Sequence, residues 1–132
     1  MHQTLQPAGW LRPKGYANGI AATGRTVFVA GQIGWDENGA FVSDDFGAQF
    51  RQVLLNTLAV LKEAGAGPEH VVRMTWFVTS RDEYAAAGAA MSAAWRELMG
   101  RTYPAMSVIM VSGLVEPAAK LEIETTAVVP EP

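Results

Sequence analysis

Two carboxylates alternate with apolar residues near the end of the chain, in the run Leu121-Glu122-Ile123-Glu124. In an extended strand, alternate side chains point to the same face, so Glu122 and Glu124 share one face. If that face is buried, at least one of them lies in an interface or a cleft, and buried carboxylates are usually paired or functional. If the strand lies at the edge of a sheet, the same pattern is a solvated polar face. The pattern alone leaves these two interpretations equal.

Other groups that often carry chemistry are absent or poorly placed. The chain has no Cys, which excludes a thiolate nucleophile, a disulfide framework and thiolate-based metal sites. The two His, His2 and His70, do not indicate a metal site, and His70 follows Gly67-Pro68 in a turn, where a surface His is the simpler interpretation. Dinucleotide-binding, Walker A and serine-hydrolase motifs do not occur. We therefore expect no metal and no cofactor.

Composition sets the class of protein. The chain has 132 residues, a net charge of −3, 49% hydrophobic residues and 17% charged residues, which predicts a single globular domain over residues 1–132. An isoelectric point near 5.3 argues against nucleic acid as a partner, since that surface is usually basic. We see neither a signal peptide nor an apolar run of the ~20 residues that a membrane span needs, so the expected location is cytoplasmic.

The elements that must position these residues follow an α+β order. Strands are predicted over 16–22, 26–30, 71–79, 106–112 and 121–129, with a hairpin turn at Asn38-Gly39. For a first helix, Ser43 and Asp44 offer the start signal, and Gly65 and Gly67 offer the stop signal. A second should begin at Ser80, which forms a capping box with Glu83, and run to about Met99. The buried stripe of the first helix is Phe46, Phe50, Val53, Thr57, Leu58 and Leu61.

Several strands are apolar on both faces, which predicts that both faces of the sheet are buried. Two helices packed side by side cover only one face of a sheet of four to six strands. The other face then needs a partner, because a large exposed apolar patch is rare on a monomer. We favour a homo-oligomer in which sheets meet around a shared axis. The alternative is a closed barrel that fills its own interior.

A set of short motifs resembles the YjgF/Rid (reactive intermediate deaminase) family over about residues 7–129. The motifs are Gly15-Tyr16, Val27-Phe28-Val29-Ala30-Gly31-Gln32, Asn56 with Leu61 and Ala64-Gly65, Tyr103-Pro104-Ala105, and Leu121-Glu122-Ile123-Glu124. The resemblance implies a chorismate-mutase-like α+β fold and a homotrimer, with sheets lining a central barrel and three clefts between subunits. It also implies hydrolysis of enamines and imines to a keto acid and ammonia, without a cofactor.

The resemblance assigns roles to individual positions. Carried over by position, the catalytic residues are Glu122 and Tyr16, and the loop 31–33 (Gly31, Gln32, Ile33) belongs to the substrate cleft. A partly buried carboxylate suits imine hydrolysis, which needs a placed water and a proton shuttle.

The sequence also departs from the family pattern. Met106 stands where active members have an Arg that clamps the substrate carboxylate, and Gly88 stands where an Asn is frequent. Met cannot pair with a carboxylate. We therefore expect poor activity on small anionic imines such as 2-aminoacrylate. Trp76 or Trp35 would line a wider pocket beside Met106, and the candidates for a replacement anion anchor are Arg12, Arg73 and Arg101.

Three functions fit the sequence. The first is a divergent enamine or imine hydrolase with a larger or less charged substrate. The second is a ligand-binding or regulatory trimer that has lost the chemistry. The third, which only the family resemblance implies, is a ribonuclease or translation inhibitor, and it is the weakest, because the chain is acidic and shows no basic stripe.

Overall fold

The computed structural model describes residues 2–132. Its strands and helices follow the order β1 (Gln3–Leu5), β2 (Gly19–Ala21), β3 (Arg25–Gln32), α1 (Phe46–Glu63), a 3₁₀ turn η1 (Pro68–His70), β4 (Val71–Val78), α2 (Arg81–Ala86), α3 (Gly88–Met99), β5 (Ala105–Met110) and β6 (Leu121–Val129). This is the α+β order that the sequence predicts. The first predicted strand, 16–22, is reduced to its second half in β2.

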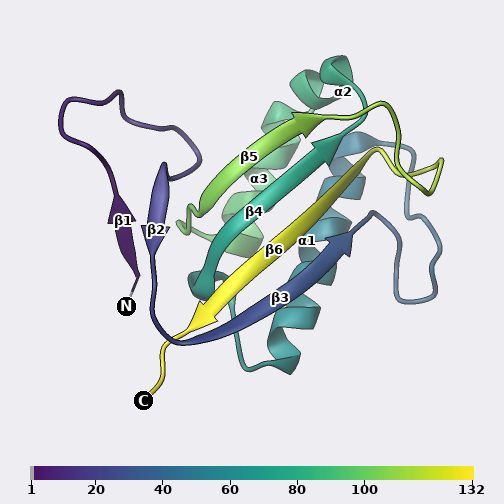
Figure 1. Cartoon of the computed structure of the whole chain (residues 1–132). Helices are drawn as coiled ribbons and strands as arrows, with labels where there is room; N and C mark the ends of the chain where they lie inside the picture. Colours follow the sequence, from purple (N-terminus) through teal and green to yellow (C-terminus); the bar gives the residue numbers. More distant parts are fainter. Residues whose placement is uncertain (1) are drawn as a thin grey trace.

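Four strands form one open mixed sheet in the order β3-β6-β4-β5 (Figure 1). The pair β4–β5 is parallel, whereas β6 runs antiparallel to both β3 and β4. An open sheet with edges at β3 and β5 excludes the closed single-chain barrel. β6 lies inside the sheet, so the interpretation of Glu122 and Glu124 as an edge-strand feature is wrong. β1 and β2 form a separate hairpin that stands beside the main sheet.

The helices α1 and α3 pack together on one face of this sheet (Figure 1). The predicted stripe of α1 faces the core: Phe50, Val53 and Leu61 are fully buried. They meet sheet residues of the same face, such as Met74 and Ile123, which are also fully buried. Burying each such side chain contributes about 1.5–3 kcal/mol, so this interface fixes the orientation of the sheet.

The starts of the two predicted helices differ from the prediction in two details. Asp45 caps α1 by accepting a hydrogen bond from the Ala48 N–H, while the Ser43 hydroxyl accepts one from the Asp45 N–H. Ser80 caps α2 through the Glu83 N–H, but the Glu83 carboxylate pairs with Lys120 instead of completing the capping box.

The second predicted helix is interrupted at Ala87, so that α3 begins at Gly88. Ala87 has φ −89° and ψ 5°, outside the regular helical range, and its N–H is shared between the carbonyls of Glu83 and Tyr84. Glycine has a low helix propensity, which makes the following position a natural place for this break.

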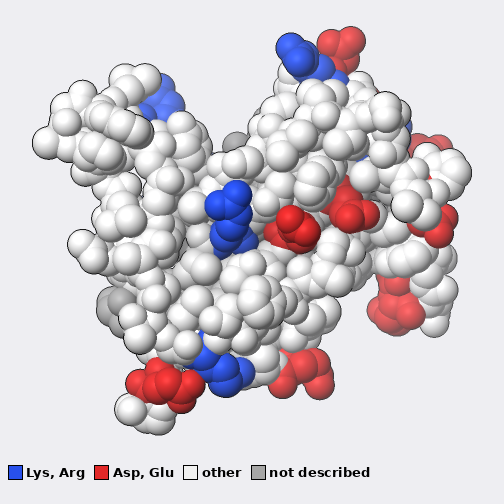
Figure 2. Space-filling model, in the orientation of Figure 1, with Lys and Arg blue, Asp and Glu red and all other residues white. Residues whose placement is uncertain are grey.

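The opposite face of the sheet, which we call the open face, carries no helix (Figure 1). Phe28 is 78% exposed there and Ile109 is 44% exposed. The charged residues of the open face, Arg73, Glu122 and Glu124, belong to β4 and β6. Figure 2 shows this face, on which charged side chains gather over β4 and β6 while most of the surrounding sheet surface is uncharged.

Candidate functional site

The segment from β1 to β2, residues 3–21, forms what we call the N-terminal arm. A cavity of about 560 Å³ lies between this arm, the edge strand β5 and the helix α3. Most of its wall is aromatic or apolar, and we call it the aromatic cavity. Its main aromatic and thioether side chains are Tyr16, Trp76, Tyr84, Trp95, Tyr103 and Met106. Its size falls within the range of roughly 300–1,000 Å³ that small-molecule sites occupy. Figure 2 shows the surface hollowed between the N-terminal arm and the rest of the molecule.

Strand pairing places Tyr16 at this cavity. The Ala17 N–H donates a hydrogen bond of 2.9 Å to the Pro104 carbonyl, and Ala17 forms a single parallel bridge with Ala105. The segment that carries Tyr16 is therefore tied to the start of β5. Tyr16 remains 41% exposed, and it also borders a neighbouring cavity.

The strand register places Met106 and Trp76 on the helix side of the sheet. Met106 pairs with Met74, and Trp76 pairs with Val108, in the parallel β4–β5 ladder. Val108 lines the aromatic cavity with Met106 and Trp76. The cavity thus contains Met106, the position at which the resemblance implies an arginine.

Gly88 begins α3 and lines the same cavity. A Cβ atom built on Gly88 meets no heavy atom within 4 Å. A side chain at this position would extend into free space, so glycine enlarges the cavity instead of relieving a clash.

The three arginines proposed as replacement anchors do not line the aromatic cavity. Arg12 and Arg101 border a neighbouring cavity of about 670 Å³ formed by the N-terminal arm. Arg73 lies in a groove of the open face with Glu124. These residues are near the motifs in the sequence, but in the fold Arg12 and Arg101 lie at the N-terminal arm and Arg73 lies on the open face of the sheet.

The cations that do line the aromatic cavity are Lys14 and Arg96. Sequence reasoning missed both. A signal for Arg96 was present, because Gly88, Ser92 and Arg96 follow one another at intervals of four residues and so lie along one side of a helix. All three line the cavity.

Glu122 lies on the opposite side of the sheet, on the open face. Glu122 pairs with Phe77 in the β4–β6 register. Trp76, which lines the aromatic cavity, directly precedes Phe77 in β4, so its side chain points to the opposite face of the sheet. Gly31 lies directly against Glu122: a Cβ atom on Gly31 would overlap the Glu122 carboxyl group. Glycine is needed here for this close approach.

The rest of the loop after β3 is fixed from α1. The Asn56 side chain donates hydrogen bonds to the carbonyls of Ile33 and Trp35, at 3.1 and 2.8 Å. Ile33 is buried, and the Gln32 side chain donates to the Ala30 carbonyl. Trp35 packs on Phe41, with ring centroids 5.9 Å apart, and does not line the aromatic cavity.

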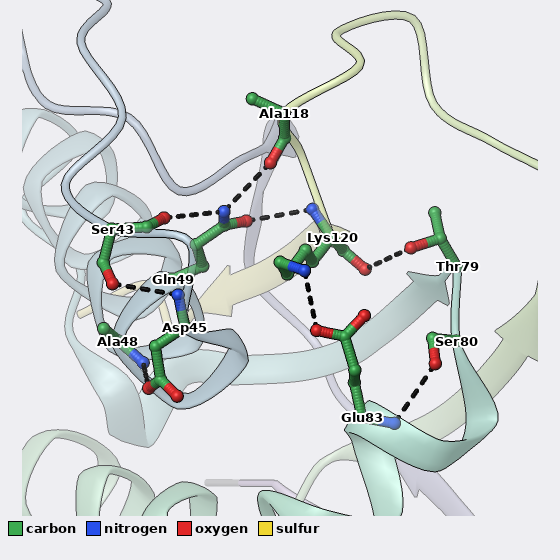
Figure 3. Close-up of polar contacts among 9 residues, drawn as sticks. All are labelled: Ser43, Asp45, Ala48, Gln49, Thr79, Ser80, Glu83, Ala118 and Lys120. Atoms are coloured by element: carbon green, nitrogen blue, oxygen red, sulfur yellow. Dashed lines mark hydrogen bonds and ion pairs between the residues drawn. The ribbon is translucent and has the colours of Figure 1, made fainter.

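A buried glutamine of α1, Gln49, fixes the start of β6 (Figure 3). Its side-chain nitrogen donates to the carbonyls of Ser43 and Ala118, both at 2.9 Å, and its oxygen accepts from the Lys120 N–H at 2.9 Å. Glu122 follows Lys120 by two residues, so this clamp sets its position. The sequence signal was a polar residue next to the buried stripe of α1.

Lys120 is held a second time by its side chain, which forms a 2.7 Å ion pair with Glu83 of α2 (Figure 3). The Thr79 hydroxyl donates to the Lys120 carbonyl at 3.2 Å. Lys120, which directly precedes β6, is thus held by Gln49 of α1, by Thr79 at the end of β4 and by Glu83 of α2.

A second ion pair joins the two long helices. Arg51 of α1 contacts Glu97 of α3 at 2.7 Å. The hydrogen bond and the charge of Arg51 lower the pKa of Glu97, and Glu97 raises the pKa of Arg51 in the same way. Both side chains are substantially exposed, so this pair lies outside the candidate site.

Within residues 2–132, no group of three or more His, Cys, Asp or Glu side chains is arranged to hold a metal ion. The helices in this part of the chain are too short or too polar to cross a bilayer.

Comparison with known proteins places the chain among relatives of one kind. Residues 11–129 match the family model described as Endoribonuclease L-PSP. A 2-iminobutanoate/2-iminopropanoate deaminase of Salmonella typhimurium is 34% identical over 113 residues, which cover 86% of each chain. A RutC family protein of Synechocystis is 36% identical over 130 residues, 97% of this chain and 95% of that protein. The crystal structure of the Rid family protein YyfB of Yersinia pestis has a TM-score of 0.85 and 34% identity, covering 97% of this chain and 98% of that one.

Proposed function

Because the chain belongs to the Endoribonuclease L-PSP family, also called the YjgF/Rid family, we propose that it is a divergent enamine or imine hydrolase. The name of the Salmonella relative supports this activity. The substrate would be a small molecule bound between subunits of a homotrimer, with no cofactor.

The observation that carries the proposal is the division of the family-matched residues between two faces. Tyr16 and Met106 line the aromatic cavity, and Glu122 with Gly31 lies on the open face. One protomer cannot bring these two groups around one substrate. A second copy, whose open face packs beside the cavity, would complete the cleft. The exposed apolar residues of the open face support this assembly.

In the proposed reaction, Glu122 is the general base and then the general acid. The carboxylate takes a proton from water as the water oxygen attacks the imine carbon. The resulting carbinolamine collapses when the nitrogen receives a proton and leaves as ammonia, which gives the ketone. Tyr16 would orient the substrate from the cavity of the neighbouring subunit. The overall reaction adds one water to the imine and releases the ketone and ammonia, with no change of oxidation state, so no redox partner is needed.

Replacing Glu122 tests this assignment. The assay measures ammonia release from imines that an amino-acid oxidase produces in the same cuvette. Glu122→Gln should lower the rate on every accepted substrate by at least about a hundredfold, in line with the usual contribution of a general acid–base group. Glu124→Gln is the matched control, because it removes the same charge on the same strand and face. Full activity in Glu122→Gln would contradict the proposed role.

A non-catalytic ligand-binding trimer is the second candidate, and Met106 favours it. The cavity lacks the guanidinium at this position that would fix an anionic substrate for attack. This candidate predicts saturable ligand binding with no ammonia release from any imine. The same assay, combined with calorimetric titration, distinguishes the two functions.

A further inference from the structure

We propose that the aromatic cavity selects 2-imino acids with a planar aromatic side chain, and that Arg96, assisted by Lys14, holds their carboxylate in place of the arginine that Met106 replaces. This inference rests on the proposed function and names the substrate class of the same site. It follows from the wall of the cavity, its charge and its size.

The wall of the cavity is a row of aromatic rings. Trp95 stacks on Tyr103 with an interplanar angle of 14° and a centroid distance of 6.4 Å. The ring centroid of Trp76 lies 6.2 Å from that of Trp95 and 5.0 Å from that of Phe50. Phe50, Trp76 and Trp95 are buried and form the back of the wall, whereas Tyr103 and Tyr16 are 45% and 41% exposed and offer ring surface to a ligand. Each aromatic pair contributes about 0.5–1.5 kcal/mol beyond the area it buries. Met106 adds a polarisable thioether, which also packs well on rings.

The charged side chains along this wall are both positive. Lys14 and Arg96 line the cavity, and no Asp or Glu does so. Within residues 2–132, the ion pairs are Arg51–Glu97 and Lys120–Glu83, so both cavity cations lack an acidic partner. Lys14 and Arg96 are exposed residues, so they are available to a ligand, and a carboxylate can accept two parallel hydrogen bonds from a guanidinium.

Helix α3 carries Arg96, the proposed anchor of the carboxylate, on the side that lines the cavity. Gly88, Ser92 and Arg96 line the cavity from successive turns. Gly88 leaves space open, and Ser92 adds a hydroxyl one turn before Arg96. The exposed ring of Tyr103 stands on the same wall, next to Trp95.

Size then separates aromatic substrates from small ones. A three-carbon imine would fill only a small part of a 560 Å³ cavity and would touch few of its rings. An aromatic 2-imino acid can contact the rings and reach the cations at the same time. Its hydrolysis consumes one water and gives the aromatic 2-keto acid and ammonia.

Binding of the stable products tests the ligand class without any need for turnover. Calorimetric titration of the assembled protein with phenylpyruvate and with pyruvate should show at least about tenfold tighter binding of phenylpyruvate. Arg96→Gln should weaken phenylpyruvate binding by about tenfold or more and leave binding of the uncharged 3-phenylpropanamide unchanged. Arg101→Gln is the control, because Arg101 borders the neighbouring cavity. Equal affinity for the two keto acids, or an equal loss in both variants, would overturn the proposal.

Turnover separates this inference from the proposed function. Imines produced by an oxidase from phenylalanine and from alanine are compared, and the phenylalanine imine should be hydrolysed at least about tenfold faster. Hydrolysis of both imines at the same rate would overturn the inference and leave the proposed function intact. Tight binding of phenylpyruvate with no hydrolysis of either imine would overturn the proposed function and retain the ligand class.

Discussion

Met106 is the position at which the family resemblance implies an arginine that clamps the substrate. Its side chain lines the aromatic cavity, which is also lined by the cations Lys14 and Arg96. Under our proposal, Met106 changes where an anion is held and which substrate fits. Sequence alone located Met106 and Gly88, because both lie within or beside short motifs. Arg96 was missed, because no motif contains it and its helical spacing from Gly88 and Ser92 was the only signal for it.

Restoring an arginine tests this view of Met106. The variant Met106→Arg should raise the rate of ammonia release from 2-aminoacrylate by about tenfold or more, because a charge pair in a partly desolvated site is worth about 2 kcal/mol or more. The wild-type protein should accelerate that release poorly. Met110→Arg is the matched control, since Met110 belongs to the same strand but does not line the cavity. Strong acceleration by the wild-type protein would contradict our interpretation of Met106.

A methyl group at Gly31 tests the placement of Glu122. In Gly31→Ala the added methyl would overlap the Glu122 carboxyl group, so the carboxylate must move away from its present position. We expect kcat to fall by about tenfold to a hundredfold, with a smaller effect on stability, because a flexible side-chain end can shift at low cost. Gly113→Ala serves as the control, since a Cβ there meets no atom within 4 Å. An unchanged kcat in Gly31→Ala would show that this contact does not set the catalytic geometry.

Among the secondary-structure elements, the strands and helices were largely predictable and their connections were not. Hydrophobic periodicity gave α1 and β4 almost to the residue, because both bury a continuous apolar face. The break at Ala87 escaped detection, since the pattern of Tyr84, Met91 and Trp95 continues across it. The clamp formed by Gln49 was also missed: two of its three backbone partners, at Ala118 and Lys120, are about 70 residues away, and periodicity carries no information about them.

Removing this clamp should loosen the start of β6. In Gln49→Leu the carbonyls of Ser43 and Ala118 and the N–H of Lys120 lose their partner. The free energy of unfolding should fall by about 2–4 kcal/mol, because buried polar groups without partners are costly. Denaturant titration measures this loss, and hydrogen exchange should show the earliest opening in residues 111–120. Glu83→Gln, which only weakens the partly exposed ion pair with Lys120, should cost less than about 1 kcal/mol.

At the scale of the whole molecule, the sequence correctly indicated that the helices cover only one face of the sheet. The apolar pattern of the other face, with Phe28 and Ile109 exposed, remains without a partner inside one chain. Periodicity could not show that Tyr16 and Glu122 lie on opposite faces, because that depends on the pairing of Ala17 with Ala105 and of Glu122 with Phe77. The proposed trimer is the arrangement that would reunite them.

Phe28 tests the assembly directly. A charge in the middle of an apolar interface is strongly unfavourable, so Phe28→Glu should dissociate the oligomer into folded monomers. Sedimentation velocity measures the change, and circular dichroism should report the same secondary structure. Val115→Glu is the control, because Val115 is 97% exposed and lies in the loop before β6. A wild-type protein that sediments as a monomer would contradict the proposed trimer.

Mixed oligomers test whether the catalytic cleft is shared between subunits. Glu122→Gln inactivates one half of the cleft, and Tyr16→Ala inactivates the other half. If each cleft takes Glu122 from one subunit and Tyr16 from its neighbour, subunits of the two variants that assemble at random form a fully intact cleft in about one quarter of cases. The refolded mixture should therefore recover about a quarter of the wild-type rate, whereas each variant alone stays inactive. If both residues acted from one protomer, every subunit of the mixture would carry a defect and no activity would return. Recovery of activity thus requires two copies of the chain around one substrate, and its absence would exclude the composite site.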